Sequence, residues 1–300
     1  MMIEKMAEIL KDYSHHCHSM TLNHTPLIKN IAKKMEEGKE LVFILPAFPA
    51  KSSSPDKTCG ELPDLGEVIA LQSLQEMCTR LSEVYAQGAK VIICSDGRVF
   101  SDVVKVSDLS IDRYNTGIKS IIAEYKLTSL SVFSMDDLFP ESTPDELRDM
   151  LLVEHAKSVD HVRNLVMTNE NYNTLFNGVH RFLLEDEIAI NKTDSKNAIS
   201  RETKKRTYEL IRRSDAWSNL LDKYFEGELR LSIHPYPIGH EKFGVKLVPS
   251  SSKWATPWHN VVVRVKNSFE LMHLKEAMKL NAVLKMEKDK YAYFEIPSFQ

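Results

Sequence analysis

Two apolar segments are each followed by polar residues that could do chemistry. The run at 41–47 leads into Phe-Pro-Ala-Lys-Ser, and the run at 89–94 leads into Ser-Asp-Gly-Arg. The carboxyl ends of parallel strands meet at one edge of a sheet, where ligands bind, so both turns should face one crevice. Taken singly, a solvated lysine and an ordinary Asp-Gly turn would look the same. The residues expected at the crevice are Lys51, Ser95, Asp96, Gly97 and Arg98.

A second group of polar side chains follows from strand alternation. Successive side chains of a strand point to opposite faces, so Leu-Arg-Leu-Ser-Ile-His at 229–234 places Arg230, Ser232 and His234 on one face. A solvated antiparallel sheet would give the same pattern. Thr-Pro-Trp-His-Asn adds Trp258 and His259 just before another apolar strand. These two segments supply the candidate histidine bases.

Two further segments contain candidate ligands. Asn-Gly-Val-His-Arg supplies His180 and Arg181 near the start of a helix, where a surface ion pair is the ordinary alternative. The segment 15–24 contains four histidines and a cysteine. Adjacent residues diverge on a helix or a strand, and the spacing matches none of the standard zinc patterns. We therefore expect no metal site.

The elements that must position these residues alternate between strand and helix in the first half. Strands are expected at about 41–47, 89–97 and 128–135. Asp64 and Glu67 stand like a capping box before a helical pattern that runs to Tyr85. Such βαβ units imply a mostly parallel sheet with right-handed crossovers. The expected fold class is α/β, with a Rossmann-like, mostly parallel sheet, helices on both faces and a smaller C-terminal α+β section.

The pattern changes after about residue 157. Long helices follow, most clearly at 200–225, and then strands return. We expect residues 1–157 to form the Rossmann-like domain and residues 158–300 to form a helical and α+β section that completes the crevice. The later elements expected are strands at 228–237, 243–249 and 260–266, a helix near 268–280 and a hairpin at 281–296.

Composition excludes several classes of protein. The chain is 43% hydrophobic and 27% charged, as in ordinary globular proteins, and its net charge of −3 gives no basic field for nucleic acid. No apolar run reaches the ~20 residues that span a bilayer, and no secretory signal pattern begins the chain. We expect a cytoplasmic protein whose four cysteines are free thiols. Without GxGxxG or a P-loop, NAD and ATP lack their usual support.

Six motifs, in order, resemble the isocyanide (isonitrile) synthases of the pyoverdine and dityrosine biosynthesis type. They run from about residue 41 to 275 and read FPAKS, LPDLGE, SDGRVFSDVV with a following VSD, RSDAWSNLL, RLSIHP and TPWHNVV. The resemblance implies an enzyme that converts the α-amine of an amino acid, typically tyrosine or tryptophan, into an isocyanide. The carbon would come from the ketone carbon of ribulose 5-phosphate. The resemblance also implies no metal or nucleotide cofactor and a separate iron- and 2-oxoglutarate-dependent oxygenase that takes the product.

This chemistry requires groups that grip two anions and a base for the α-amine. Arginine suits bidentate binding of phosphate and carboxylate, and lysine adds a point charge. Imidazole titrates in the range that a base needs, so His234 or His259 fits that role. The candidates for anion binding are Lys51, Arg98, Arg181 and Arg230.

Later intermediates require stabilised oxyanions and a reusable acid. Fixed donors at Ser95, the Gly97 amide and Lys51 could stabilise negative oxygen, and Asp96 or Asp102 could move protons. Lys51 could instead form a Schiff base, although the electrostatic role fits better because the substrate amine must itself bond to that carbon. An aromatic pocket could draw on Phe48, Tyr114, Trp217, Trp254 or Trp258.

Two other functions stay open on the sequence. A non-catalytic phosphosugar-binding protein would have arginines but no histidine near the ligand carbonyl. An atypical Rossmann-like oxidoreductase would bind NAD despite the absent phosphate turn. The sequence does not identify the amino acid, the pathway product or the oligomeric state.

Overall fold

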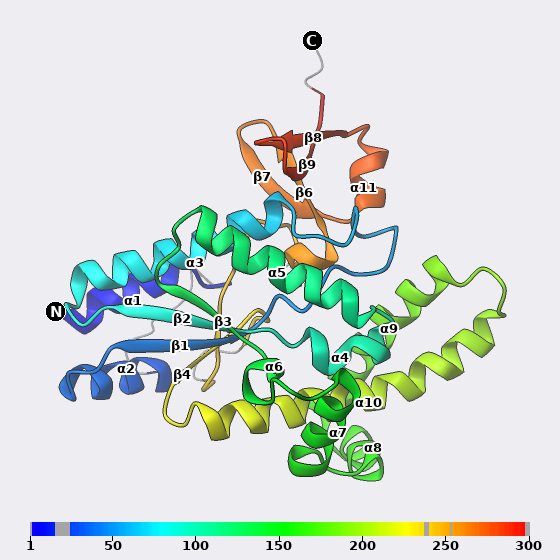
Figure 1. Ribbon diagram of the computed structural model, residues 1–300, viewed down its shortest axis with the longest axis horizontal. Helices are drawn as coiled ribbons and strands as arrows, with labels where there is room; N and C mark the ends of the chain where they lie inside the picture. The colour runs from blue at the N-terminus through cyan, green and yellow to red at the C-terminus, as the bar shows by residue number, and fades with distance from the viewer. Residues whose placement is uncertain (1, 16–24, 237–239, 253, 298–300) are drawn as a thin grey trace.

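The computed structural model describes residues 2–15, 25–236, 240–252 and 254–297. Two sheets and the helices around them make up the fold (Figure 1). The elements that build and cover the first sheet are α1 Met2–Asp12, α2 Pro26–Glu36, β1 Leu41–Pro46, α3 Leu65–Val84, β2 Ala89–Cys94, α4 Gly97–Val104, α5 Asp108–Glu124, β3 Leu130–Phe133, α6 Met135–Leu138, α7 Pro144–His155, α8 Val159–Thr168, α9 Glu170–Ile190, α10 Lys196–Tyr224, β4 Leu229–Ser232 and β5 Phe243–Gly244.

The first sheet has the order β3-β2-β1-β4-β5, and each neighbouring pair is parallel. This confirms the expected α/β class. The order reverses between β1 and β4, which is the topological switch point where ligands bind in such sheets. Ile44 of β1 lies opposite Arg230 of β4. The division at about residue 157 stays a prediction, but the sheet continues past it, because β4 and β5 come from the later segment.

Two apolar layers cover the sheet. Leu41, Phe43 and Leu45 face one layer, which includes side chains of α1, α2, α3 and α5. Ile44 and Cys94 face the other, which includes side chains of α4, α6, α7 and α10. In Figure 1, α3 and α5 lie along one side of the sheet and α7 and α10 along the other. Arg230 therefore points toward the layer that contains α10.

Helix starts in the first half follow the signals in the sequence. The Asp64 side chain accepts from Gly66 N at 2.7 Å, and Glu67 Oε2 accepts from Asp64 N at 2.9 Å, so both form the cap of α3. Thr143 and Glu146 cap α7 in the same way. Both expected capping boxes are confirmed.

A smaller mixed sheet with the order β7-β6-β9-β8 follows a short 3-10 helix, η1. The expected helix near 268–280 is partly wrong, because its first residues pair with β6 as an antiparallel strand across a turn at Lys266, whose φ is 56°. The expected strand at 243–249 shortens to Phe243 and Gly244, which pair with β4, and Val245 adds an isolated antiparallel bridge to Ser14. Within the described residues, no helix is both long and apolar enough to cross a membrane. The elements are η1 Pro257–His259, β6 Val261–Val265, β7 Ser268–Met272, α11 Leu274–Lys279, β8 Val283–Glu287 and β9 Tyr291–Glu295.

Candidate active site

Lys51 lies in a buried network and not in the crevice. Its Nζ donates to Asp64 Oδ2 at 2.8 Å and to the Pro257 carbonyl at 2.9 Å, and it lies 2.8 Å from Glu67 Oε2. Tyr114 donates its hydroxyl to Glu67 at 3.0 Å. The Lys51 side chain is 0% exposed. The capping carboxylates of α3 pair with its charge, and the expectation that Lys51 touches substrate stays a prediction.

Charge in this network keeps Lys51 protonated. Burial opposes its positive charge, but Asp64 and Glu67 more than compensate, so the pKa of Lys51 is raised. Only the neutral amine attacks a ketone, so this network disfavours the Schiff-base alternative for Lys51. Burial raises the pKa of Asp64 to about 7, with Glu67 acting in the same direction and Lys51 against it. The network connects the turn that carries Lys51 to the start of α3 and to η1.

The two turns expected at the sheet edge do converge, and the segment before β6 meets them. Ser95 Oγ donates to the Phe48 carbonyl at 3.1 Å, and Ser52 N donates to the Trp258 carbonyl at 2.8 Å. Phe48 has a φ of 58°, an uncommon value for a bulky residue. A Cβ on Gly97 would lie 2.0 Å from the Pro49 carbonyl oxygen. The Phe-Pro-Ala-Lys-Ser and Ser-Asp-Gly-Arg turns therefore fit only with glycine at this contact.

Aromatic packing and polar bonds complete this junction. The Trp258 ring is buried, with its centroid 5.1 Å from that of Phe48. Ser95 Oγ also bonds to Asn115 Oδ1 at 2.8 Å. Ser95 and Trp258 thus form the wall of the junction, and their expected contact with substrate stays a prediction.

Asp96 is a half-buried acid at the carboxyl end of β2, and its Oδ1 is buried. Its Oδ1 has no hydrogen-bond partner within the described parts of the chain, and its side chain does not cap α4. Burial raises the pKa of Asp96 to about 7. This carboxyl can hold a proton near neutral pH and release it when a ligand changes its surroundings.

Arg98 and Asp102 belong to ion pairs that hold α4 in place, and their expected roles in substrate binding stay predictions. The Arg98 guanidinium donates to Asp108 at 3.0 Å and also to Asp112 and Asp136. Asp102 accepts two hydrogen bonds from Arg213 of α10. These ion pairs connect α4 to α5, α6 and α10, while the buried Nε of Arg98 has no hydrogen-bond partner in the described residues.

Arg181 is exposed on α9, and its expected role in substrate binding stays a prediction. Residues four apart share one face of a helix, and the α9 face that reaches the site carries Phe182 and Asp186. Asp186 lies 2.6 Å from Lys57 Nζ and accepts from Ser52 Oγ at 3.2 Å. Sequence reasoning missed the pair of Lys57 and Asp186, because these two residues are far apart along the chain.

Arg230 and Lys242 form a cationic pair on the α10 side of the sheet. Arg230 Nη2 lies 3.5 Å from Ser218 Oγ, and Lys242 Nζ lies 3.4 Å from the same oxygen. Arg230 Nη1 is 3.5 Å from Asp222, but Nε and Nη1 are buried and have no hydrogen-bond partner in the described chain. Burial lowers the pKa of both groups, and Arg230 lowers that of Lys242 further. Unpaired buried donors of this kind fit an anion.

Sequence reasoning missed Lys242. It precedes β5, whose place beside β4 brings it to Arg230. The short strand offers too few residues for a periodic signal. Only the tertiary pairing reveals the lysine.

Two histidines lie near this pair and are neutral at physiological pH. His234 is exposed just beyond β4, yet the protein around it removes enough water to lower its pKa to about 4, with help from His15 and Lys242. Burial, the Lys57 charge and His234 lower the pKa of His259 to about 3. Loss of hydration destabilises the charged imidazole and so lowers the pKa of each histidine.

Packing fixes the orientation of His259 more firmly than that of His234. The His259 ring packs against Phe182 at 4.8 Å, and its Nδ1 is 3.3 Å from Thr256 Oγ1. The His234 ring contacts Trp254, with centroids 5.3 Å apart. His234 thus combines a neutral imidazole, solvent access and a nearby cationic pair.

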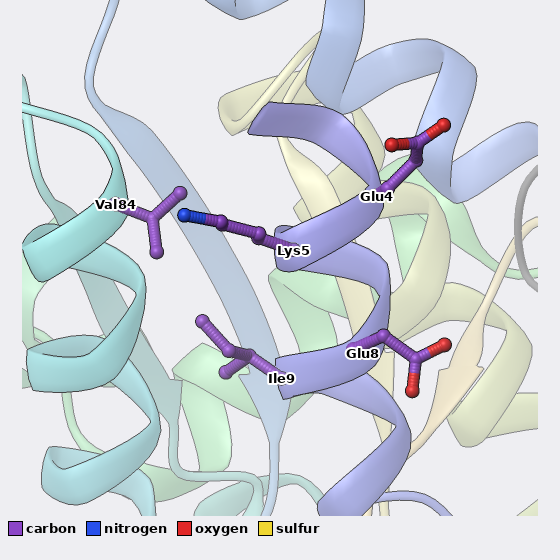
Figure 2. A pocket seen from close by; sticks show the side chains of 5 residues that line it. All are labelled: Glu4, Lys5, Glu8, Ile9 and Val84. Carbon is purple, nitrogen blue, oxygen red and sulfur yellow. The ribbon is translucent and has the colours of Figure 1, made fainter. Parts of the chain in front are cut away.

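A surface hollow lies elsewhere, between α1 and α3 (Figure 2). It is lined by Glu4, Lys5, Glu8 and Ile9 of α1 and by Val84. Val84 ends α3, just before β2 begins, so the hollow lies at the amino ends of the strands. The hollow is therefore at the opposite edge of the sheet from the carboxyl ends of the strands, where the candidate site lies.

Among the residues that the structure describes, no three histidine, cysteine or acidic side chains come close enough to hold a metal ion. Most of the His15–His24 cluster, including Cys17, lies outside the described residues. His15 is described, and its Nε2 is 3.0 Å from the Ile233 carbonyl. The cysteines that the structure describes, Cys59, Cys78 and Cys94, are free thiols, as expected.

The fold is α/β, and at the switch point of its parallel sheet Arg230 lies beside Lys242, with His234 just beyond the end of β4. Residues 31–284 match the family described as pyoverdine/dityrosine biosynthesis protein. The L-tryptophan isonitrile synthase AmbI2 of Fischerella ambigua is 38% identical over 269 residues, which cover 90% of this chain and 82% of that protein. The L-tyrosine isonitrile synthase of Pseudomonas aeruginosa is 35% identical over 275 residues, which cover 90% and 84%.

A solved structure agrees with these relatives. The crystal structure of the PvcA protein of Pseudomonas aeruginosa matches with a TM-score of 0.90 and 32% identity, covering 98% of this chain and 99% of that one. The chain therefore belongs to the pyoverdine/dityrosine biosynthesis family and is an enzyme of the isonitrile synthase kind. The resemblance read from the six sequence motifs is confirmed.

Proposed function

We propose that the protein converts the α-amine of an aromatic amino acid, tyrosine or tryptophan, into an isonitrile, with ribulose 5-phosphate as the carbon donor. The amine nitrogen loses both hydrogens and gains the ketone carbon of the sugar phosphate, and the remaining sugar carbons leave. The names of the relatives support the amino acid as substrate. The cationic pair formed by Arg230 and Lys242 is the single observation that supports a phosphorylated co-substrate.

The phosphate is assigned to Arg230 and Lys242 on chemical grounds. Arg230 offers Nε and Nη1, which have no hydrogen-bond partner in the described protein although Nη1 lies 3.5 Å from Asp222, and Lys242 adds a second positive charge beside the same Ser218 hydroxyl. A phosphate oxygen can accept from both cations at once. It would also relieve the repulsion that lowers the pKa of Lys242.

The proton transfers are assigned to His234 and Asp96. The attacking amine must be neutral, and the imidazole of His234, whose pKa is lowered to about 4, is free to accept its proton. Asp96, whose pKa is raised to about 7, can donate a proton to a leaving sugar hydroxyl. His259 is the alternative base, although its ring is packed against Phe182.

The two alternatives are less well supported. A passive phosphosugar-binding protein has no need for a neutral histidine beside its cationic pair. An NAD-dependent oxidoreductase would need a glycine-rich phosphate turn after the first strand, whereas the turn after β1, Ala-Phe-Pro-Ala-Lys-Ser, contains no glycine. Tight binding of NAD in a fluorescence titration would revive that alternative.

We also propose that the reaction needs no metal or nucleotide, that the enzyme is cytoplasmic, and that a separate iron- and 2-oxoglutarate-dependent oxygenase takes the product. Imine and enol intermediates can be stabilised by cationic side chains alone. Turnover should therefore survive exhaustive chelation. A loss of turnover that one divalent ion restores would contradict the metal-free reaction.

The test of this function is incubation of the purified protein with ribulose 5-phosphate and a panel of amino acids. Carbon-13 at the ketone position of the sugar should appear in the product, with both amine hydrogens lost, as read by mass spectrometry. The proposal fails if no amino acid gains this carbon, or if the label arrives from another position.

Two substitutions separate binding from chemistry. Arg230→Ala should mainly raise KM for the sugar phosphate, because each charge-assisted hydrogen bond is worth roughly 1.5–3 kcal/mol. His234→Ala should lower kcat by about 10²–10⁴ while the sugar phosphate still binds. Arg181→Ala, at the exposed arginine of α9, is the matched control and should change neither. If His234→Ala keeps the parent kcat, His259 becomes the preferred base.

A further inference from the structure

Trp254 is exposed where the other aromatic candidates for the pocket are buried. Its side chain is 65% exposed, whereas Trp217 and Trp258 are each 2% exposed, and Phe48 and Tyr114 are fully buried. Water contact with so much apolar surface is unfavourable unless another apolar group covers it. The exposed ring therefore requires its own explanation.

The loop that carries Trp254 is braced by serine side chains. Trp254 N donates to Ser252 Oγ at 3.2 Å, and Ser252 N donates to Ser250 Oγ at 3.1 Å. Ser250 Oγ in turn donates to the Leu271 carbonyl of β7 at 3.2 Å. On the other side of the loop, the Pro257 carbonyl accepts from buried Lys51. The indole is thus presented from a backbone that is held on both sides.

The ring position is also specific. Trp254 contacts His234, with centroids 5.3 Å apart and an interplanar angle of 46°. Lys242 of the cationic pair lies close enough to His234 to lower its pKa. His234 therefore lies between an exposed aromatic surface and an anion-binding group.

We propose that Trp254 is a substrate-binding platform on which the aromatic side chain of the amino acid stacks, beside His234. A stacked ring would cover the exposed indole and place the α-amine next to the neutral imidazole. The sugar phosphate, held at Arg230 and Lys242, would then meet that amine from the other side. The assignment rests on the proposed function and adds a specificity-determining residue to it.

The assignment is tested with Trp254→Ala and the conservative Trp254→Phe. Calorimetry would measure the binding of L-phenylalanine, L-tyrosine and L-tryptophan to the parent and to both variants. Trp254→Ala should weaken the aromatic amino acid that the parent binds best by about tenfold, and Trp254→Phe should recover most of that loss. KM for ribulose 5-phosphate should change by less than about twofold in both variants, a difference that a general structural defect would not produce.

Three results would overturn the platform. These are unchanged affinity in Trp254→Ala, an equal loss of amino acid and sugar phosphate affinity, and a parent that binds none of the three amino acids. The proposed function is judged separately, by transfer of labelled carbon. Aromatic binding that depends on Trp254 but yields no isonitrile would uphold the platform and refute the proposed function. Isonitrile formation with unchanged affinity in Trp254→Ala would uphold the proposed function and refute the platform.

Discussion

Lys51 Nζ lies 2.8 Å from Asp64 Oδ2, and the two side chains are 0% and 6% exposed. Glu67 lies equally close to the same Nζ, so one cation serves two buried carboxylates. The pair joins the turn after β1 to the cap of α3, and the Lys51 bond to the Pro257 carbonyl extends the connection to η1. Lys51, the lysine that the sequence most suggested for chemistry, therefore links the turn after β1 to α3 and η1.

Lys51→Met should destabilise the protein by about 3–5 kcal/mol, because Asp64 and Glu67 would face each other in the interior without their cation. Urea denaturation at pH 7 would measure the loss. Lys90→Met is the matched control. Lys90 pairs with Glu40 at the surface, where the side chains are 42% and 41% exposed, so its loss should cost less than about 1 kcal/mol. Equal effects of the two substitutions would contradict the buried network.

Arg230→Met should stabilise the ligand-free protein by about 1 kcal/mol, because a buried and poorly paired cation is replaced by an apolar side chain of similar length. Inorganic phosphate should raise the Tm of the parent and leave that of the variant nearly unchanged. Thermal denaturation with and without phosphate checks both points. A lower Tm for the ligand-free variant would mean that Asp222 already satisfies Arg230.

Gly97→Ala should separate the two turns at the sheet edge. The new Cβ would lie 2.0 Å from the Pro49 oxygen, and overpacking of this kind costs about 1–3 kcal/mol. Gly178→Ala in α9 is the control, because no atom lies within 4 Å of the new Cβ. Alanine there should stabilise the helix by about 1 kcal/mol. Urea denaturation distinguishes the opposite signs, and turnover should fall only in the Gly97 variant.

His259→Asn should flatten the acid limb of stability. Burial, followed by the Lys57 charge, lowers the pKa of His259 to about 3 in the fold, against about 6.5 in the unfolded chain. Between these values the unfolded chain binds the extra proton, so the parent loses up to about 1.4 kcal/mol per pH unit as the pH falls from 6.5. Asp64 and Asp96, with raised pKa values, act in the opposite direction in both proteins. Denaturation at pH 7 and 5.5 should therefore show the smaller loss in His259→Asn, and equal losses would contradict a neutral His259.

The sequence predicted the convergence of turns better than it predicted which side chains reach a ligand. Strand ends and capping boxes are local signals, and they located Phe48, Gly97 and the start of α3. The partners of Lys51, Asp64 and Glu67, stand in the neighbouring motif LPDLGE. The same two residues form the helix cap, so the sequence alone does not show that they also pair with a lysine. Likewise, the acidic residues that accept from the Nη atoms of Arg98 follow it in the sequence, at 108, 112 and 136. Their spacing alone does not show that they lie on helices facing Arg98.

The remaining site residues depend on tertiary pairing. Lys242 reaches Arg230 only because β5 lies beside β4, and Asp186 reaches Lys57 only because α9 packs its inner face against the site. Trp254 was one of five aromatic candidates, and exposure distinguishes it from the others. Burial and exposure of single side chains are the properties that periodicity in a sequence does not resolve.

Asp96→Asn should remove the alkaline limb of the pH–rate profile. Burial raises the pKa of Asp96 to about 7, so its carboxyl is protonated below that pH and can donate to a leaving hydroxyl. The kcat of the parent should therefore fall as the pH rises through 7. In Asp96→Asn the kcat should be lower by about 10²–10⁴ and should no longer fall there, because asparagine has no proton to lose. Asp102→Asn is the control, since Asp102 is paired with Arg213 and should affect stability while the limb remains. A parent kcat that rises through pH 7 would instead make Asp96 a base, and a limb that persists in Asp96→Asn would assign the proton to another group.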